Sequence, residues 1–418
     1  MANKEVKHTL IIILAKANKL SYHDSMLELK LLNNLLSRLR VGAIRIIDWT
    51  GNSIVYGQGE PYLTVTIHNP KAIRALIRNL TMGFGESYMN GDIDVIGNPV
   101  NIGRIVSENQ AAFTHPALNL LSRRLTPNRQ SKQKHQIAHH YDIGNNFYKL
   151  WLDPSMTYSC AYFKTPNDTL EQAQVQKRDH VLKKLMLEPG MTLLDIGSGW
   201  GELLIAAFQQ YGVKGYGVTL SEEQFKESTA KIRRLGLEDD ITIELINYQE
   251  LTSRPTTFDR IVSVGMFEHV GAGNHKTYFD VVEKLLNDGG ITVLHTISNE
   301  VETPSDPWID KYIFPGGYLP SVRETVAMFP SHNLRMIDYE NLRIHYAMTL
   351  EIWLEQFDAY KNEVIALYDE KFYRMWRLYL AGSASGFRYD ALSLSQYVMT
   401  KGLRNDLPLT REYLYLAV

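Results

Sequence analysis

The stretch Leu193–Gly201 constrains the fold of this chain more than any other part of the sequence. It reads Leu-Leu-Asp-Ile-Gly-Ser-Gly-Trp-Gly and joins an apolar run, residues 191–196, to a helix-like run, residues 202–211. Glycines in alternation let the backbone turn sharply and let a ligand approach it closely. A strand, a glycine-rich turn and a helix in this order are typical of the nucleotide site of a doubly wound α/β sheet. A tight strand-to-helix turn without a ligand is the plainer alternative.

The sequence around this motif alternates between strand-like and helix-like segments. A long helix is predicted over residues 170–187, ahead of the motif. The alternation predicts a mostly parallel sheet with helices on both faces, in which ligands bind at the C-terminal ends of the strands. The predicted strands are short and apolar: 192–196, 214–219, 241–246, 260–264 and 291–295.

Residues 1–110 are predicted to form a smaller α+β domain. Apolar residues recur at helical spacing over residues 21–40, which indicates core packing, with membrane insertion as the alternative. Strands are expected at 43–49, 54–56 and 62–68, and a helix from Asn69-Pro70 to about Gly83. Glycines at 83, 85 and 91 predict that the domain closes in turns.

Residues 111–138 are predicted to be a basic linker, and residues 139–418 the catalytic domain. Between Glu108 and Asp142 the sequence contains no acidic residue, whereas Arg123, Arg124 and Arg129 lie there. A solvated interdomain loop explains this composition. Attraction to anionic lipid headgroups is the alternative, worth about 1 kcal/mol per basic residue near a membrane surface.

Composition excludes several classes of protein. The formal net charge of −2 shows no nucleic-acid signature. A single cysteine, Cys160, excludes an intramolecular disulfide and a cysteine-built metal site, so no metal is expected and a reducing cytoplasm fits. The apolar run at residues 10–15 is too short to span a bilayer and lacks the features of a secretory signal. An enzyme of this composition that acts on lipid would work from the membrane surface.

Polar and glycine-rich motifs follow each predicted strand. The glycine spacing, with Asp195 two residues ahead of Gly197, resembles motif I of the S-adenosylmethionine (SAM) methyltransferases and differs from the dinucleotide fingerprint. Together the motifs resemble those of the cyclopropane fatty acyl phospholipid synthases, and the resemblance covers the whole chain. It implies a doubly wound, mostly parallel, seven-stranded class I methyltransferase sheet. The motifs are Thr-Leu-Ser-Glu-Glu-Gln at 219–224, Asn-Tyr-Gln-Glu at 247–250, Gly-Met-Phe-Glu-His-Val-Gly at 265–271, His-Thr-Ile at 295–297 and His-Tyr at 345–346.

The resemblance implies a set of SAM-binding residues whose chemistry suits the ligand. Asp195 could orient the glycine loop or meet the ammonium group of SAM. The hydroxyl of Thr219 and the amide of Gln224 suit ribose hydroxyls, and Tyr248 could cover the adenine. The implied residues are Tyr158, Ser159, Asp195, Gly197, Gly199, Gly201, Thr219, Leu220, Gln224, Tyr248 and Gln249.

The resemblance also implies a bound bicarbonate ion as the base of the reaction. The side chains of Glu268, His295 and Tyr346 and the backbone of Cys160 and Ile297 are implied to hold it. A fixed anion stabilises a developing carbocation and accepts its proton. Each side chain also has a purely structural interpretation: Glu268 could cap a helix, His295 could be a hydrogen-bonded strand residue and Tyr346 could belong to the core. The aromatic rings at 162, 163, 312 and 314 could add cation–π stabilisation, and we interpret the histidines at 269 and 345 as structural.

We therefore expect an enzyme that transfers the SAM methyl carbon to cis double bonds of phospholipid acyl chains and forms cyclopropane rings. The N-terminal part resembles the lipid-binding domain of the bacterial phospholipid enzymes, which the mycolic acid enzymes lack, and this favours a phospholipid substrate. Peripheral contact with the inner face of the membrane, a cytoplasmic location and a homodimer are expected with it. The alternatives are an enzyme that leaves a methyl or methylene branch, and a protein that binds lipid and SAM without chemistry.

Overall fold

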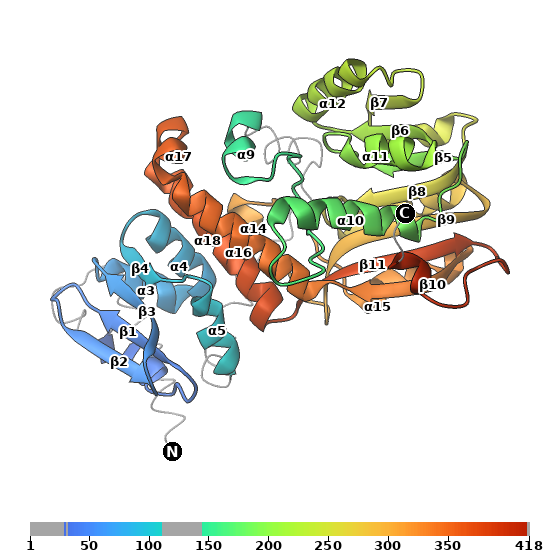
Figure 1. The fold of residues 1–418 in the computed structure, drawn as a ribbon. Coiled ribbons are helices and arrows are strands. Elements are labelled where there is room, and N and C mark those ends of the chain that lie inside the picture. The colour runs from blue at the N-terminus through green and yellow to red at the C-terminus, as the bar shows by residue number, and fades with distance from the viewer. Residues whose placement is uncertain (1–28, 31, 111–143, 416–418) are drawn as a thin grey trace. The chain divides into compact units, whose positions relative to one another are not determined.

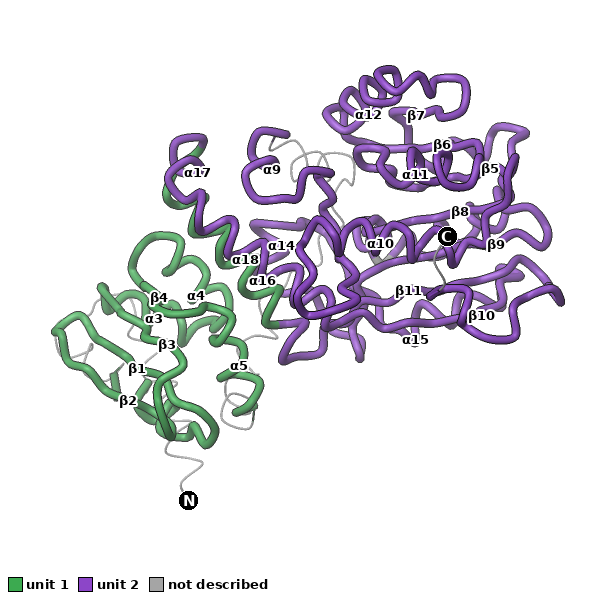
Figure 2. Tube along the Cα trace, in the orientation of Figure 1, with its two compact units in different colours: residues 1–128, 368–385 green, residues 129–367, 386–418 purple. Residues whose placement is uncertain are grey.

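A computed structural model describes residues 29–30, 32–110 and 144–415. The chain groups into two units, residues 1–128 with 368–385, and residues 129–367 with 386–418 (Figure 2). The predicted linker, residues 111–138, lies outside the described residues, and so do residues 21–28 and 31 of the predicted helix at 21–40. Residues 368–385 group with the first unit, whereas the sequence-based division assigned them to the second domain.

The first unit contains a four-stranded sheet in the order β2-β1-β3-β4 (Figure 1). Its strands are β1 Ala43–Ile47, β2 Ser53–Gly57, β3 Pro61–Ile67 and β4 Ile93–Gly97. Strand β3 alternates as predicted, with Leu63, Val65 and Ile67 buried. Leu36 and Leu39, from the predicted helix at 21–40, are buried in the same core.

The predicted helix after Asn69-Pro70 and the turns after Gly83 are wrong in detail. Two helices stand there, α3 Lys71–Arg78 and α4 Leu80–Met89, and α5 Asn101–Glu108 follows β4. Asn79 is extended between α3 and α4, and its side chain accepts a hydrogen bond from the Met82 N–H as an N-cap. Gly83 lies inside α4, and it must be glycine because a Cβ there would clash with the Ala75 backbone. Close helix packing, not a turn, accounts for this glycine.

Part of α18, Glu370–Tyr389, belongs to the first unit because two arginines hold it there. The Arg374 guanidinium donates to the Tyr88 carbonyl, to the Ile93 carbonyl at 2.5 Å and to the Asp94 carboxylate at 2.6 Å. It also lies 4.3 Å from the centre of the Tyr88 ring, and Arg377 donates to the Tyr88 hydroxyl.

The second unit is built on a seven-stranded sheet in the order β10-β11-β9-β8-β5-β6-β7, which confirms the predicted fold class. The predicted strands are present, and the fifth is longer than predicted. Strand β11 runs antiparallel to its neighbours β9 and β10, and the other pairs are parallel. The strands are β5 Thr192–Ile196, β6 Lys214–Thr219, β7 Ile241–Leu245, β8 Phe258–Val264, β9 Leu286–Asn299, β10 Leu334–Asn341 and β11 Leu392–Lys401.

Helices cover both faces of this sheet. Leu193 and Val293 point into the cluster under α10 and α11, on the face turned to the viewer in Figure 1, whereas Leu194 and Leu294 point into the cluster under α13. Among the described helices none is long and apolar enough to cross a membrane. The helices of this unit are α9 Asn145–Trp151, α10 Leu170–Lys184, α11 Glu202–Tyr211, α12 Glu222–Leu235, α13 His275–Leu285, α14 Pro307–Tyr312, α15 Val322–Met328, α16 Arg343–Ala359, α17 Lys361–Leu367 and the end of α18.

Candidate active site

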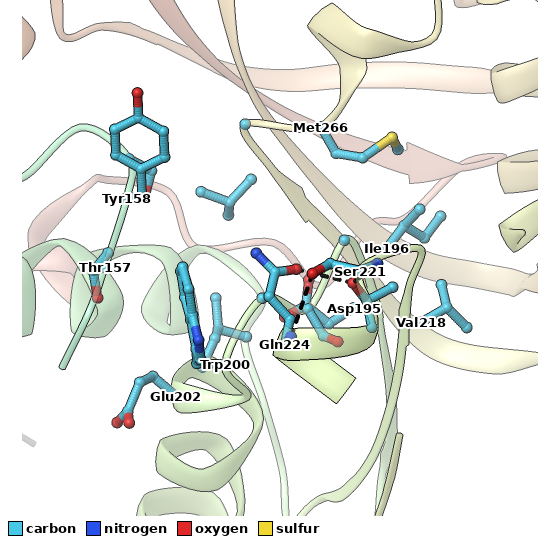
Figure 3. Close-up of a pocket in the computed structure, with 18 of the residues that line it drawn as sticks. Thr157, Tyr158, Asp195, Ile196, Trp200, Glu202, Val218, Ser221, Gln224 and Met266 are labelled. Carbon is cyan, nitrogen blue, oxygen red and sulfur yellow. Dashed lines mark hydrogen bonds between the residues drawn. The ribbon is translucent and has the colours of Figure 1, made fainter. Parts of the chain in front are cut away.

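A cavity of about 220 Å³ opens at the C-terminal ends of β5, β6, β7 and β8. This is where a doubly wound sheet binds its ligand. Figure 3 shows Asp195, Ser221 and Gln224 at the strand ends, with Thr157 and Tyr158 reaching the cavity from the segment before α10. Every SAM-binding residue implied by the sequence lines the cavity except Gly201, which precedes α11 as its N-cap.

The glycine loop has the backbone conformation that its glycine spacing predicts. Gly197, Gly199 and Gly201 all have positive φ, at 89°, 54° and 83°, in the region that side chains disfavour. The neighbouring strand contributes a further glycine, Gly217, on which the loop packs. A Cβ at Gly217 would stand 2.7 Å from the Ser198 Cβ, so this position needs glycine for close approach.

A buried acid, Asp195, and a buried amine, Lys177, both line the cavity, and their charges interact. Asp195 is 3% exposed, and its Oδ1 has no hydrogen-bond partner among the described residues. Burial raises the pKa of Asp195 to about 7, against the opposing effect of the Lys177 charge. Burial likewise lowers the pKa of Lys177 to about 8, and its Nζ donates to the Ser159 hydroxyl at 3.0 Å. The cavity therefore offers a buried acceptor and a buried cation to a polar ligand.

The end of β6 provides a hydrogen-bonded polar cluster beside the acid. The Thr219 hydroxyl donates to Gln224 Oε1 at 2.9 Å, and the Ser221 hydroxyl caps α12 by accepting from the Gln224 N–H. Beyond β7, the buried ring of Tyr248 packs edge-on against Tyr278. Tyr248 thus gives the cavity an aromatic lining residue that is packed in place.

Glu268 and Ile297, two members of the implied anion site, are in direct contact. Glu268 lies in a short helical turn after β8, and its Oε1 accepts from the Ile297 backbone N–H at 2.6 Å. Its Oε2 is buried without a hydrogen-bond partner in the described part of the chain. Burial raises the pKa of Glu268 to about 7, so this carboxyl exchanges its proton near neutral pH.

His295 on β9 offers the second unsatisfied polar atom of this region. It is 1% exposed, and its Nδ1 lies 2.9 Å from the Gln396 amide nitrogen. Its Nε2 is buried and has no hydrogen-bond partner within residues 29–30, 32–110 and 144–415. Burial and the nearby charges of Lys177 and Lys184 hold the pKa of His295 well below its usual range, so the ring is neutral.

Tyr346 lies on α16, and the same helix binds the backbone directly after Cys160. The Ala161 N–H donates to the Thr349 hydroxyl at 3.0 Å, and Thr349 lies three residues from Tyr346 on the same helical face. The Tyr346 ring packs against Phe387 at 4.5 Å between centroids. Burial raises the pKa of the Cys160 thiol, which stays neutral. None of the implied catalytic residues lines the cavity. Cys160 and Glu268 are next in sequence to the lining residues Ser159 and His269, whereas His295, Ile297 and Tyr346 have no lining residue beside them in sequence.

Several residues have other surroundings than the sequence suggested. Tyr162 stacks on His180 and His345, at 4.2 Å and 4.8 Å between centroids. The rings at 163, 312 and 314 do not line the cavity, and they pack on His345, Trp308 and His269 respectively. His269, interpreted as structural, lies in the cavity wall, where burial lowers its pKa to about 4.

Sequence reasoning missed the contribution of α10 to the cavity. Gln174 and Lys177 line it, and Gln174 donates to the Ser159 carbonyl at 2.9 Å. The two residues are three apart in the predicted helix, so they share a face. Polar residues on the buried face of a helix are the signal that could have identified them.

Comparison with known proteins agrees with this geometry. The family model described as mycolic acid cyclopropane synthetase matches residues 128–397, and a domain family described only as of unknown function matches residues 31–117. The chain is 41% identical over 362 residues to the cyclopropane-fatty-acyl-phospholipid synthase of Escherichia coli, covering 84% of this chain and 92% of that protein. It is 37% identical over 382 residues to a Pseudomonas putida protein described as "Probable fatty acid methyltransferase", covering 89% and 96%.

Solved structures show the same similarity in the second unit. The cyclopropane synthase MmaA2 from Mycobacterium tuberculosis has a TM-score of 0.61 and 34% identity, covering 66% of this chain and all of that one. Mycolic acid cyclopropane synthase CmaA1, solved with SAH and CTAB, has a TM-score of 0.60 and 34% identity, with 66% and 99% covered.

The fold and the cavity define a SAM-dependent methyltransferase. Within that class, the chain belongs to the mycolic acid cyclopropane synthetase family, as the family model and the Escherichia coli relative show.

Proposed function

We propose that this enzyme transfers the methyl carbon of SAM to cis double bonds of phospholipid acyl chains and closes a cyclopropane ring. The observation that supports it most is that Glu268 Oε2 and His295 Nε2 are both buried without a hydrogen-bond partner among the described residues. An ordinary methyl transfer to oxygen or nitrogen needs no buried acid and neutral imidazole held apart from the SAM pocket. A reaction that must remove a proton from carbon after the transfer does need such a site.

The chain's own residues suit SAM in this cavity. Asp195 Oδ1 is a buried acceptor without a partner, which suits the ammonium group, and Lys177 suits a carboxylate. Thr219 and Gln224 offer hydroxyl and amide groups to the ribose, and Tyr248 offers an aromatic face to the adenine. These assignments extend the residues implied by the sequence and are part of the proposal.

The reaction requires little covalent help from the protein. The π electrons of the alkene form a bond to the methyl carbon, the carbon–sulfur bond breaks, and sulfur keeps that electron pair. The acyl chain is left with a carbocation. A C–H bond of the new methyl group then supplies the electrons that close the three-membered ring, and its proton leaves to a base. The protein must orient the alkene, exclude water from the cation and hold the base.

The residues implied for bicarbonate fit a small anion. Bicarbonate would supply the base that accepts the methyl proton. A neutral His295 can donate from Nε2, and Glu268 Oε2 can accept from the anion's hydroxyl or, when protonated, donate to its oxygen. The Ile297 N–H already donates to Glu268, so Ile297 acts here by orienting that carboxyl. Tyr346 and the backbone of Cys160 complete the proposed set.

Two further parts of the proposal concern the setting of the reaction. We propose that the N-terminal unit helps to present the acyl chain, because a long chain lifted from a bilayer exposes CH₂ groups that cost about 0.8 kcal/mol each in water. With it we propose peripheral contact with the cytoplasmic face of the membrane and a homodimer. The length of the Escherichia coli relative matched by this chain, 92%, supports a phospholipid substrate.

A second product is favoured by one observation, the Pseudomonas putida relative described as "Probable fatty acid methyltransferase". If the carbocation loses a proton from the acyl chain and not from the new methyl group, a methyl-branched alkene results. Both products add one CH₂ to the substrate, so mass alone does not separate them.

The test incubates the full chain with SAM and vesicles of unsaturated phospholipid, followed by mass spectrometry and proton NMR of the extracted lipid. Cyclopropanation adds one CH₂ and removes both olefinic protons of the double bond. Addition of CH₂ with an olefinic signal retained would replace the proposal by the methyl-branched product. No mass change, with SAM bound in calorimetry, would contradict both.

A further inference from the structure

A row of polar residues crosses three adjacent strands of the second unit. Glu340 on β10 is the register partner of Gln396 on β11, and Gln396 is the register partner of His295 on β9. Directly paired residues of antiparallel strands place their side chains on one face, close enough to interact. Gln396 is fully buried and His295 nearly so. The row therefore links the edge of the sheet to the proposed catalytic histidine.

Helix α10 supplies a lysine and a histidine that organise this row. Lys184 is fully buried, and its Nζ donates to Gln396 Oε1 at 2.6 Å and to Glu340 Oε2 at 2.5 Å. His180, one turn earlier on the same helical face, lies 2.6 Å from the same Glu340 oxygen. Glu340 balances the buried positive charge, and these contacts hold its pKa at about 2, so it remains an anion.

The chemistry of these groups fixes the direction of each hydrogen bond. A lysine ammonium only donates, so the Gln396 atom that faces Lys184 must be the carbonyl oxygen. The amide NH₂ of Gln396 then faces His295 Nδ1, at 2.9 Å, and can only donate to it. A neutral imidazole has one N–H, and since its Nδ1 accepts, that proton is on Nε2.

We infer that Gln396 and Lys184 are positioning residues that hold His295 as the Nε2–H tautomer. This inference rests on the proposed function for its catalytic meaning. The proton on Nε2 makes His295 a hydrogen-bond donor toward the proposed anion site and excludes it as the base that removes the methyl proton. A donor at this place stabilises and orients an anion, which leaves proton acceptance to that anion.

Two substitutions of Gln396 separate this role from simple packing. Q396E keeps the size of the side chain but presents a carboxylate that accepts from Lys184 and also from His295, so the histidine proton moves to Nδ1. Q396M removes both hydrogen bonds, so both tautomers become populated. Gln209, an exposed residue of α11, provides the matched control Q209E, which adds the same charge away from the row.

The measurement is ¹⁵N NMR of the full chain with ¹⁵N-labelled histidine side chains and no substrate, with the His295 signal identified by its loss in H295Q. We expect the neutral Nε2–H pattern in the unsubstituted chain and in Q209E, the Nδ1–H pattern in Q396E and a mixture in Q396M. Turnover of Q396E should fall by about 10- to 100-fold, as for other residues that orient a catalytic histidine, while SAM affinity stays within twofold.

The outcomes separate the inference from the function on which it rests. An Nδ1–H or doubly protonated His295 in the unsubstituted chain, or an unchanged Nε2–H signal in both Gln396 variants, would overturn the positioning role even if cyclopropane is formed. A tautomer switch in Q396E, in a chain whose unsubstituted form makes no cyclopropane, would support the positioning role and refute the proposed function. Since either variant is sufficient for the NMR comparison, loss of folding in one leaves the other to decide.

Discussion

Replacing Glu268 by glutamine should stabilise the protein while it abolishes most of the activity. Burial raises the pKa of Glu268 from 4.5 to about 7. Each pKa unit corresponds to about 1.4 kcal/mol, so ionisation of this carboxyl inside the fold costs about 3 kcal/mol relative to the unfolded chain. Glutamine cannot ionise, and its Oε1 can still accept from the Ile297 N–H.

The sign of the pH dependence follows from the raised pKa. Between pH 4.5 and about 7 the folded chain keeps the Glu268 proton that the unfolded chain has lost, so stability falls as pH rises through this window. E268Q lacks this loss of stability, because glutamine does not titrate. The stability of E268Q relative to the unsubstituted chain should therefore increase across the window and reach about 3 kcal/mol above it. Asp195, whose pKa burial also raises to about 7, is common to both chains and cancels in the difference.

Urea denaturation followed by tryptophan fluorescence at about pH 5 and about pH 8 measures this difference as a shift between midpoints. The exposed Glu355 of α16 provides the control E355Q, whose midpoint shift relative to the unsubstituted chain should be the same at both pH values. For E268Q, a midpoint shift relative to the unsubstituted chain that is equal at both pH values would refute the reasoning. In parallel, turnover of E268Q should fall by about 10²- to 10⁴-fold with SAM affinity retained in calorimetry. A loss of SAM affinity in proportion to the loss of rate would show that Glu268 serves the cofactor and not the anion.

Three further predictions concern the loop, the first unit and the linker. In G217A the new Cβ would stand 2.7 Å from the Ser198 Cβ, so the glycine loop must shift at a cost of about 1–3 kcal/mol in folding stability. SAM affinity should then fall about tenfold, and unchanged affinity by calorimetry would contradict the packing argument. R374M should lower the stability of the first unit by about 2 kcal/mol, because it removes the hydrogen bonds of the guanidinium to the Tyr88 and Ile93 carbonyls and to the Asp94 carboxylate, and faster proteolysis than in the control K371M would confirm it. Binding to anionic vesicles should weaken with added salt, since surface charges are screened over about 8 Å at physiological ionic strength, and salt-independent binding would show that Arg123, Arg124 and Arg129 belong to a solvated loop only.

The strands and cavity around the glycine motif could be predicted because their signals are local. An apolar run that enters a G-x-G-x-G turn has few alternatives, and polar residues after parallel strands must meet at one edge of the sheet. These rules identified the ends of β5, β6, β7 and β8 as the cavity, where the structure has it. They required no knowledge of which helix covers which face.

The last two strands of the sheet could not be identified in the same way. Strand β11 contains Ser393, Ser395 and Gln396, and all three are buried. A buried strand with polar residues lacks the apolar pattern on which strand prediction depends. Its polar residues are satisfied by partners distant in sequence, such as Ser298, 97 residues away from Ser395. Lys184 and Gln396 are 212 residues apart, so no local pattern could have joined them.

Helix α18 shows most clearly why the chain cannot be divided at one point. Its first part contacts the N-terminal unit through Arg374, whose partners Tyr88, Ile93 and Asp94 lie about 280 residues earlier in the sequence. Residues 386–389 of the same helix belong to the second unit. A chain cut at residue 139 would keep Arg374 and lose all three of these partners, so this part of α18 would lose the contacts that group it with the first unit. Reduced activity of such a fragment would then report damage to α18 as well as loss of lipid presentation. Variants of the intact chain are therefore the sound test of what the N-terminal unit does.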